Sequence, residues 1–575
     1  MSHILSHITI KNFRSCKDAE FDLTEYTPMV GYNNAGKSNI LQAVEWIFKD
    51  KLLSSDFYND QDQSIEVEGL IEGVTQDVID RLDEEHREPI RPYIVDNRIK
   101  IKRVQIANAT KKADMKLYIE HPENGFRPNP RGISNAIKAL FPDPIKIGAM
   151  ENAAEDSSKA KTSTTIGKLL SELCDAIKSN HEELFNRHLN AISRRIGADG
   201  NKRVDTLDKI DSSINEKIEN FFPGVSLKLH FNVPDFDDIF KAGTVKVYED
   251  QHIGREFGEY GHGAQRSIQM ALIQELAEVK KNTQGESTTL LLIDEPELYL
   301  HPFAIEQVRE ALFGLTKNGY QVIFSTHSAQ MITSDKAQHT LLIRKSTEKG
   351  THSRQRLQDA LNVVIPDARA QSEHLFALSQ STDVLFSNRV ILTEGKTELR
   401  LLPLIYKAIN NATLGQKQLG LIETGSVDNI GKTMAVLNKM DLPCKAIVDL
   451  DYVFKGAIHN QLIAEDDKNI IALKSILAGM CETNEIVMKG DIPGAKHCAP
   501  LAQKDDATVF IENLHNKLKE SNIWVWKKGA IEAHLGITAK NEHSWAMFKQ
   551  NIDKNGVDNA CSDSDEIRSM IEWLG

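Results

Sequence analysis

The stretch Gly31-Tyr-Asn-Asn-Ala-Gly-Lys-Ser38 decides the fold, because it matches the phosphate-binding loop G-x-x-x-x-G-K-[S/T] at every fixed position. Residues 26–30 before it have the pattern of a short strand, which only Pro28 weakens, and residues 37–48 after it carry apolar side chains at helical spacing. In such a unit the backbone N–H groups at the start of the helix bind phosphate, and the glycines let the backbone approach closely. The lysine neutralises phosphate charge, and the serine offers its hydroxyl to Mg²⁺. We therefore expect a nucleoside triphosphate site here.

The composition is that of a large globular protein without a membrane segment. At 575 residues the chain exceeds one ordinary core, so we expect roughly three or four domains. No apolar stretch reaches about 18 residues, and residues 1–15 lack the basic and apolar regions of a signal peptide. The six cysteines form no C-x-x-C pair, which argues against a structural zinc site and a disulfide framework. We expect a cytoplasmic protein that makes no contact with membranes.

The formal net charge of −13 argues against a protein that coats nucleic acid nonspecifically, but it does not exclude a DNA enzyme with local basic strips. The segment Arg98-Ile-Lys-Ile-Lys-Arg103 is one candidate strip. The same pattern is typical of the solvated face of a strand. The sequence leaves both interpretations open.

The region around the loop resembles the first part of an ABC-type ATPase. Residues 4–13, 64–71 and 99–106 have strand patterns, and residues 76–86 have a helical one. This arrangement resembles the antiparallel sheet beside the nucleotide core of those ATPases. Near 150–165 the composition becomes that of a linker.

Residues 165–222 form a long helical stretch with apolar side chains three and four residues apart. Apolar stripes on an inserted helical arm predict pairing with the same arm of a second subunit. An ordinary helical layer packed on its own ATPase domain is the alternative.

A second glycine-rich segment, Glu-Tyr-Gly-His-Gly-Ala-Gln-Arg-Ser at 259–267, occupies the place of the ABC signature. Its residues depart from the common Leu-Ser-Gly-Gly-Gln. A helix follows, and Gly263 with the helix N-terminus is suited to bind the γ-phosphate of a nucleotide held by a second subunit.

The apolar run 290–293 predicts a buried strand that ends at Asp294 and Glu295. We expect Asp294 to hold Mg²⁺ and Glu295 to orient the attacking water. A later strand ends at His327, the ABC switch position, and the order of loop, signature, acidic strand and histidine resembles an ABC-type ATPase. The residues expected to contact ATP or its metal ion are Asn33, Asn34, Gly36, Lys37, Ser38, Asn39, Gly263, Asp294 and His327.

A second set of acidic residues follows strands in the C-terminal part of the chain. A strand ends at Glu394, a glycine turn follows, and Glu398 opens a helix. The predicted strand 445–451 ends in Asp449 and Asp451, two positions that share a strand face. Because the carboxyl ends of parallel strands lie side by side, we expect one carboxylate cluster that binds Mg²⁺ or Mn²⁺. A divalent ion pair there is suited to phosphodiester cleavage.

Glu394-Gly395…Glu398 followed by Asp449-x-Asp451 resembles the signature of a TOPRIM domain, the metal-dependent fold of topoisomerases, primases and some nucleases. An ABC-type ATPase joined to a C-terminal TOPRIM domain resembles the OLD (overcoming lysogenization defect) nuclease family over nearly the whole chain. It is also similar to the nuclease subunit of the Gabija phage-defence system. The resemblance implies a homodimer or higher assembly, Mg²⁺-dependent cutting of DNA, and defence against phage. It leaves open whether a helicase-like partner protein is needed.

The resemblance also implies further site residues near the C-terminus. OLD-type nucleases carry an additional acidic ligand after a strand and a turn, and Glu532 is the residue that matches. They use a lysine beside the scissile phosphate, for which the candidates are Lys527, Lys528, Lys549 and Lys554. The expected metal ligands and catalytic groups of the nuclease site are Glu394, Glu398, Asp449, Asp451 and Glu532.

We therefore expect an α/β protein made of an ABC-type P-loop ATPase, a helical dimerisation insert and a TOPRIM domain. The predicted boundaries are 1–155 and 223–350 for the ATPase, 156–222 for the insert, 351–388 for a connecting helix and 389–575 for the TOPRIM domain. The predicted function is an ATP-regulated, divalent-metal-dependent DNA endonuclease in phage defence. The alternatives are a regulatory or sensor ATPase that controls another effector, and a DNA-repair ATPase resembling RecF that does not cut.

Overall fold

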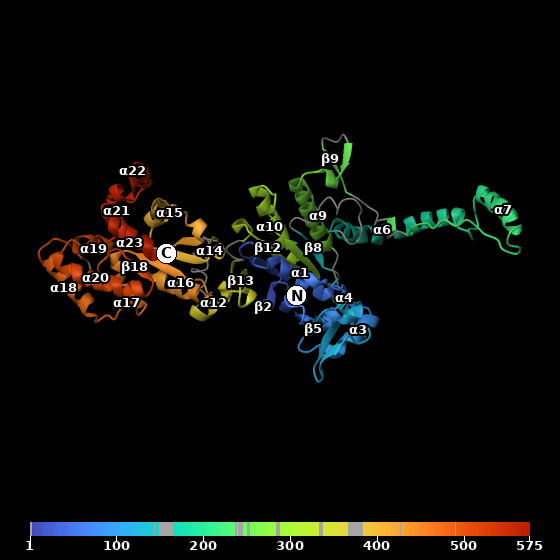
Figure 1. Ribbon diagram of the computed structural model, residues 1–575, viewed down its shortest axis with the longest axis horizontal. Coiled ribbons are helices and arrows are strands. Elements are labelled where there is room, and N and C mark those ends of the chain that lie inside the picture. Colours follow the sequence, from blue (N-terminus) through green and yellow to red (C-terminus); the bar gives the residue numbers. More distant parts are fainter. Residues whose placement is uncertain are drawn as a thin grey trace. The chain divides into compact units, whose positions relative to one another are not determined.

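The computed structural model describes residues 3–142, 144–148, 165–235, 238–239, 245–249, 253–282, 288–332, 337–365, 383–425, 427–488, 490 and 492–575. The chain divides into two compact units, whose elements are labelled in Figure 1. The first unit comprises Met1–Thr27 and Ser38–Thr326, and the second comprises Pro28–Lys37 and His327–Gly575.

Antiparallel strands form one part of the first unit, in the order β7-β6-β5-β4-β1-β2. Buried and partly exposed residues alternate along β4 and β5, as expected where one face of a sheet covers a core. The strands are β1 (Ile4–Phe13), β2 (Cys16–Asp22), β4 (Ile65–Glu72), β5 (Arg98–Gln105), β6 (Met115–His121) and β7 (Gly125–Pro128). The short helices α2 (Gln76–Asp80) and α3 (Glu84–Ile90) replace the single helix predicted at 76–86, and α4 (Ile133–Leu140) follows β7.

The basic strip at 98–103 lies on β5. Arg98 Nε is 2.8 Å from a carboxylate oxygen of Glu72, and Lys100 Nζ is 2.6 Å from one of Glu68, both on the neighbouring β4. Arg103 is buried. Because its charges are paired across the two strands, the strip fits a solvated strand face better than a DNA-binding surface.

Parallel strands form the other part of the first unit, in the order β12-β11-β8. They are β8 (Ile145–Ile147), β11 (Thr289–Asp294) and β12 (Tyr320–Thr326). All residues of β12 and all but the last of β11 are buried, which explains their continuous apolar sequences. Helix α10 (Pro302–Thr316) connects β11 to β12, and helix α1 (Lys37–Phe48) follows the phosphate-binding loop.

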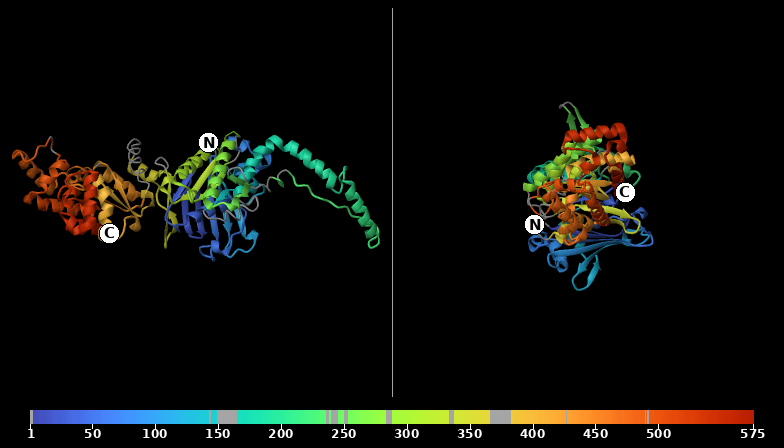
Figure 2. Two further views of the ribbon diagram at one scale, coloured as in Figure 1. Left: turned by 90° about the horizontal axis from the view of Figure 1, so that it is seen from above. Right: turned by 90° about the vertical axis from the view of Figure 1, so that its left-hand side faces the viewer.

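The predicted helical insert consists of α6 (Thr165–Ile196) and α7 (Asp205–Glu219). Figure 2 shows α6 as one long helix, with α7 beyond its end. The insert exposes apolar side chains, among them Phe221 and Phe222 after α7, which are 77% and 68% exposed. The hairpin β9 (Lys246–Glu249) and β10 (Ile253–Glu256) leads to α9 (His262–Asn282).

In the second unit, β3 (Tyr26–Val30) pairs in parallel with β13 (Leu341–Ser346), which pairs with β14 (Gly350–Ser353). A separate sheet has the order β16-β15-β17-β18, and all its strands are parallel. They are β15 (Arg389–Thr393), β16 (Leu419–Glu423), β17 (Cys444–Val448) and β18 (Ile523–Val525). This is the α/β arrangement that the C-terminal sequence predicts.

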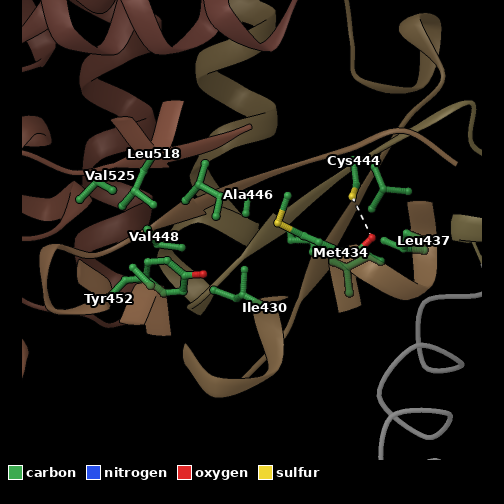
Figure 3. Packing of buried hydrophobic residues seen from close by; sticks show 14 of the residues in the cluster. Ile430, Met434, Leu437, Cys444, Ala446, Val448, Tyr452, Leu518 and Val525 are labelled. Atoms are coloured by element: carbon green, nitrogen blue, oxygen red, sulfur yellow. Dashed lines mark hydrogen bonds between the residues drawn. The ribbon is translucent and has the colours of Figure 1, made fainter. Parts of the chain in front are cut away.

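Helices cover this parallel sheet. They are α15 (Lys396–Asn410), α16 (Val427–Lys439), α21 (Ile531–Leu535), α22 (Glu542–Ala560) and α23 (Ser564–Leu574). Figure 3 shows the packing of α16 on β17, where Ile430, Met434 and Leu437 lie in one buried cluster with Cys444, Ala446 and Val448. Between β17 and β18 the chain forms the helices α17 (Gly456–His459), α18 (Lys468–Glu482), α19 (Ala495–Leu501) and α20 (Asp505–Glu520).

The linker predicted at 150–165 lies outside the described residues except for its last one. The same holds for residues 366–382 of the predicted connecting helix, whose described flanks contain α12 (Leu357–Val364) and α14 (Asp383–Phe386). Among the described helices, none combines the length and the apolar character needed to cross a membrane.

Candidate nucleotide site and metal centre

The phosphate-binding loop directs its lysine toward the predicted switch histidine. Gly36 has a φ of +103°, a conformation that glycine adopts readily, and α1 starts at the next residue. The buried Lys37 Nζ donates to Gly31 O at 2.9 Å and lies 2.8 Å from His327 Nε2. Because an ammonium can only donate, the Nε2 atom of His327 accepts and carries no proton in this arrangement.

The acidic strand is tied to the start of α1. Ser38 Oγ donates to Asp294 Oδ2 at 2.6 Å, and Ser325 Oγ on the parallel strand β12 donates to Asp294 Oδ1. Glu295 has a φ of +50°, an uncommon conformation for a residue other than glycine. This arrangement joins the two groups that the motif assigns to the metal ion of the nucleotide.

Arg266 connects the signature segment to this acidic turn and was not predicted from the sequence. The side chain is buried on α9, and Nη2 donates to the carbonyl oxygens of Asp294 and Glu295, both at 2.9 Å. Burial lowers the pKa of Arg266 to about 10, and the charges of nearby carboxylates oppose that shift. Arg266 therefore holds the turn through its backbone. A single arginine in a helix gives no sequence signal for such a role.

The other residues predicted to contact the nucleotide have different surroundings. Asn33 and Asn34 are exposed on the loop, and Asn34 has a φ of +68°. Asn39 donates its side-chain amide to Ser15 Oγ at 2.6 Å, so its side chain bonds to the end of the β1–β2 hairpin. Gly263 lies in the first turn of α9, where a Cβ atom would be 3.0 Å from Tyr299 O.

Three of the predicted metal ligands meet in the second unit. Single carboxylate oxygens of Glu394, Asp449 and Asp451 all lie within 4.8 Å of one another. Glu394 follows β15 and Asp449 follows β17, and these strands are parallel neighbours. The expectation that Asp449 and Asp451 share a strand is wrong, because β17 ends at Val448 and residues 450–454 form a 3₁₀ helix. That turn brings Asp451 to the cluster instead.

The two other predicted acids are buried beside this cluster. Glu398 accepts a hydrogen bond from Trp526 Nε1 at 3.2 Å, and Glu532 accepts one from Thr397 Oγ1 at 2.5 Å. The charges of Glu398 and Glu532 both act on Asp449. Glu398 and Glu532 therefore lie close enough to Asp449 to interact with it electrostatically, and we refer to the five carboxylates together as the acidic centre.

A lysine that the sequence did not single out lies at this centre. Lys540 Nζ is 3.3 Å from Glu532 Oε2 and 3.7 Å from Asp449 Oδ2. Burial lowers the pKa of Lys540, but the charges of Asp449 and Glu532 more than offset it, so its pKa is raised. Two of the predicted lysines are engaged elsewhere, because Lys527 pairs with Glu566 at 2.9 Å and Lys528 with Asp563 at 2.7 Å.

The carboxylates of the centre repel one another. Burial, followed by the charge of Asp451, raises the pKa of Glu394 to about 6, and burial raises the pKa of Glu398 to about 7. Burial and the charges of Glu398 and Glu394 raise the pKa of Asp449 well above its ordinary value. Within the described residues, the buried Oδ1 of Asp451 has no hydrogen-bond partner. Crowded carboxylates with an unsatisfied buried oxygen fit a divalent cation, which prefers oxygen ligands.

The fold and these two sites define a P-loop ATPase joined to a TOPRIM domain. The family model described as "AAA domain, putative AbiEii toxin, Type IV TA system" matches residues 27–332. The model described as "Overcoming lysogenization defect protein-like, TOPRIM domain" matches residues 385–451. These two domains imply the use of a nucleotide and of a divalent metal ion.

Relatives with these domains carry nuclease names. The chain is 38% identical to the Old nuclease of Escherichia phage P2, over 99% of this chain and 97% of the relative. It is 23% identical to the OLD nuclease of Thermus scotoductus, over 78% and 82% of the two chains. It is 22% identical to Endonuclease GajA of Bacillus cereus, over 92% and 82%. The chain therefore belongs to the OLD nuclease family and is an ATPase-coupled nuclease, as the order of its motifs predicted.

Proposed function

We propose that this protein is an ATP-regulated, divalent-metal-dependent DNA endonuclease that acts in defence against phage. The observation that carries the proposal is the cluster of Glu394, Asp449 and Asp451, with ligand oxygens within 4.8 Å of one another. A sensor ATPase or a repair ATPase without cutting activity has no use for such a cluster. The relative named Endonuclease GajA supports internal cleavage, and the family resemblance supports DNA as the substrate.

The acidic centre is suited to Mg²⁺ or Mn²⁺, both of which prefer carboxylate oxygens. Glu394, Asp449 and Asp451 would hold one ion, and Glu398 and Glu532 would provide ligands beside it. A bound divalent ion would activate water and stabilise the leaving oxygen.

Lys540 is our choice for the lysine that contacts the scissile phosphate. Its ammonium already lies beside Asp449 and Glu532, and a phosphate that enters the centre would meet the same positive charge. Thr397 and Trp526 orient Glu532 and Glu398 through the hydrogen bonds given above.

ATP would bind at the loop of α1. Lys37 would neutralise the phosphates, Ser38 and Asp294 would hold Mg²⁺, and Glu295 would orient the attacking water. Gly263 would contact the γ-phosphate bound by a second subunit, so that two chains complete each site. The exposed apolar residues of the helical insert support a homodimer or higher assembly.

Plasmid cleavage tests the proposal. Supercoiled plasmid is incubated with the purified chain and Mg²⁺ or Mn²⁺, with and without ATP, and compared with Asp449→Ala. Asp466→Ala is the control, because Asp466 is an exposed aspartate outside the cluster. We expect nicked or linear DNA with the native chain and Asp466→Ala, and a loss of at least about a hundredfold with Asp449→Ala, because ligand removal weakens the metal site.

Intact plasmid under every condition would overturn the nuclease proposal, and so would equal cutting by Asp449→Ala. Cleavage by the purified chain alone would also show that a helicase-like partner is not required. Comparison of Lys540→Ala with Lys528→Ala tests whether Lys540 contacts the scissile phosphate. Equal cutting rates of the two variants would contradict that assignment.

A further inference from the structure

A groove lies next to the loop that carries Lys540. Its volume is about 530 Å³, and it is formed by the end of α21, the segment after it and one side of α22. Gly536 ends α21 with a φ of +76°, and Asn541 caps the start of α22. Lys540 lies in the short connection between these two positions, so the groove and the metal centre share one loop.

The lining of the groove is polar and not acidic. Its polar side chains include Thr538, His543, Ser544, Gln550, Asn551 and Lys554. Among the described residues that line it, none carries a carboxylate, although the chain has 82 Asp and Glu residues and a net charge of −13. Leu535 and Phe548 are buried at its base. In a protein of this net charge, a groove lined without carboxylates repels a polyanion less than the rest of the surface does.

The groove has the chemistry of a surface that contacts a nucleic-acid backbone. Amides, hydroxyls and lysines are the side chains that bind phosphate and sugar oxygens. Met547 is 54% exposed at the edge and adds an apolar surface for a sugar or a base.

The groove is also within reach of a strand held at the metal centre. Thr538 and Lys540 are two residues apart, so their Cα atoms are separated by at most about 7 Å. Successive nucleotides of a duplex strand advance by about 3.4 Å along the helix axis. A strand whose phosphate contacts Lys540 therefore enters the groove within a few nucleotides.

We propose that the groove between α21 and α22 binds the DNA strand that flanks the phosphate to be cut. This inference rests on the proposed function and extends it to a substrate-binding surface. The contacts are to the backbone of the strand, so they raise affinity for DNA of any sequence and carry no sequence preference.

A matched pair of variants on α22 tests the inference. Asn551→Asp places a negative charge in the groove at nearly constant size, and the oxygen that accepts from Asn555 Nδ2 is retained. Asn559→Asp makes the same change on the same helix outside the groove. Binding of fluorescein-labelled DNA to the full chain is measured by anisotropy in EDTA, and cleavage is measured in Mg²⁺ or Mn²⁺.

We expect Asn551→Asp to raise the Kd and the KM for DNA about tenfold through repulsion of the phosphates, with kcat at saturating DNA unchanged. Asn559→Asp should stay within about twofold of the native chain, since its exposed side chain is not part of the groove lining and salt screens exposed charges. The exposed Lys554→Gln, which cannot disturb the core, should lower affinity and reduce the slope of log K against log salt by about one.

A result in which the native chain cuts DNA, while Asn551→Asp and Lys554→Gln bind DNA as tightly as it does, would overturn the proposal that the groove binds DNA. That result would leave the nuclease proposal intact. A native chain that neither binds nor cuts DNA would overturn both. A loss of kcat without a change in Kd would also contradict the inference, because it would assign Asn551 to the metal centre.

Discussion

Glu398 is the most deeply buried of the five candidate metal carboxylates, at 3% exposure. Burial raises its pKa to about 7, the charge of Glu532 adds to the shift, and the hydrogen bond from Trp526 opposes it. Burial of an ionised carboxylate destabilises the folded protein at neutral pH, because the charge loses its contact with water. The retention of Glu398 in the core is consistent with a cation that neutralises it when bound.

The contribution of Glu398 to the stability of the metal-free protein should fall between about pH 4.5 and pH 7. The folded state binds the Glu398 proton more tightly than the unfolded state, whose pKa is near the ordinary 4.5, so stability decreases as pH rises from that value through about 7. A shift of one pKa unit corresponds to about 1.4 kcal/mol. Because the pKa rises from 4.5 to about 7, Glu398→Gln should be more stable than the native chain at pH 8 by about 3–4 kcal/mol and nearly equal to it near pH 4.5.

Urea denaturation in EDTA, followed by tryptophan fluorescence, checks this prediction. Four of the five tryptophans lie between Trp524 and Trp573, so the signal reports mainly on the unit that contains the acidic centre. Glu465→Gln, an exposed change, is the control. A stability difference between Glu398→Gln and the native chain that is the same at pH 8 as at pH 5 would contradict the prediction.

Gly529 fixes the turn that holds the acidic centre. Its φ is +103°, a Cβ atom would be 3.1 Å from the backbone of Ala499, and its carbonyl accepts from Leu450 N at 2.8 Å. Gly529→Ala should cost about 1–3 kcal/mol of stability, since both the backbone conformation and the contact are unfavourable for alanine. It should also weaken Mn²⁺ binding, because Leu450 lies between Asp449 and Asp451.

Denaturation curves and isothermal titration with Mn²⁺ measure both effects. Gly494→Ala is the matched control, since a Cβ atom there would meet no other atom within 4 Å. If the two alanine variants behave alike, Gly529 does not constrain the turn.

At the scale of elements, helix α1 begins at the lysine that we expect to bind phosphate. Lys37 at its start contacts Gly31 O and His327, whereas Lys49, just past its end, pairs with Glu45 on the surface of the helix. Lys37→Ala should weaken ATP binding by at least about tenfold because phosphate charge loses its partner, and Lys49→Ala should not change it. Titration of each variant with a fluorescent ATP analogue measures this affinity, and circular dichroism confirms that the variants fold. Unchanged binding by Lys37→Ala would remove the nucleotide assignment.

The elements themselves were predicted best where the pattern is local and strong. The strands that end at Glu394 and Asp294 follow from short apolar runs, and the structure has them within a residue of the predicted positions. The strand before Asp449 was predicted too long. Residues Leu450–Phe454 form a 3₁₀ helix instead of extending the strand. Over so few positions, the periodicity of apolar residues does not distinguish these two structures.

At the scale of the whole molecule, the helical insert is the candidate surface for self-association. Phe221 and Phe222 are largely exposed, and a monomeric protein rarely leaves two adjacent phenylalanines in water. The double variant Phe221→Asp/Phe222→Asp should lower the molar mass measured by light scattering from that of a dimer or larger assembly toward one chain. Val487→Asp, at an equally exposed position in the other unit, should leave the mass unchanged. A native chain with the mass of a monomer would contradict this prediction.

The sequence by itself determined the nucleotide loop, the acidic strand and the order of the two domains, because each of these motifs is a contiguous pattern whose chemistry depends on neighbouring residues. It also predicted that Glu394 and Asp449 would meet, since parallel strands align their carboxyl ends. Only the tertiary structure brought Lys540 to the metal centre, Arg266 to the acidic turn and the polar side of α22 next to the loop that carries Lys540. These residues carry no local pattern, and their positions depend on how a loop and two helices pack against strands that are distant in the sequence.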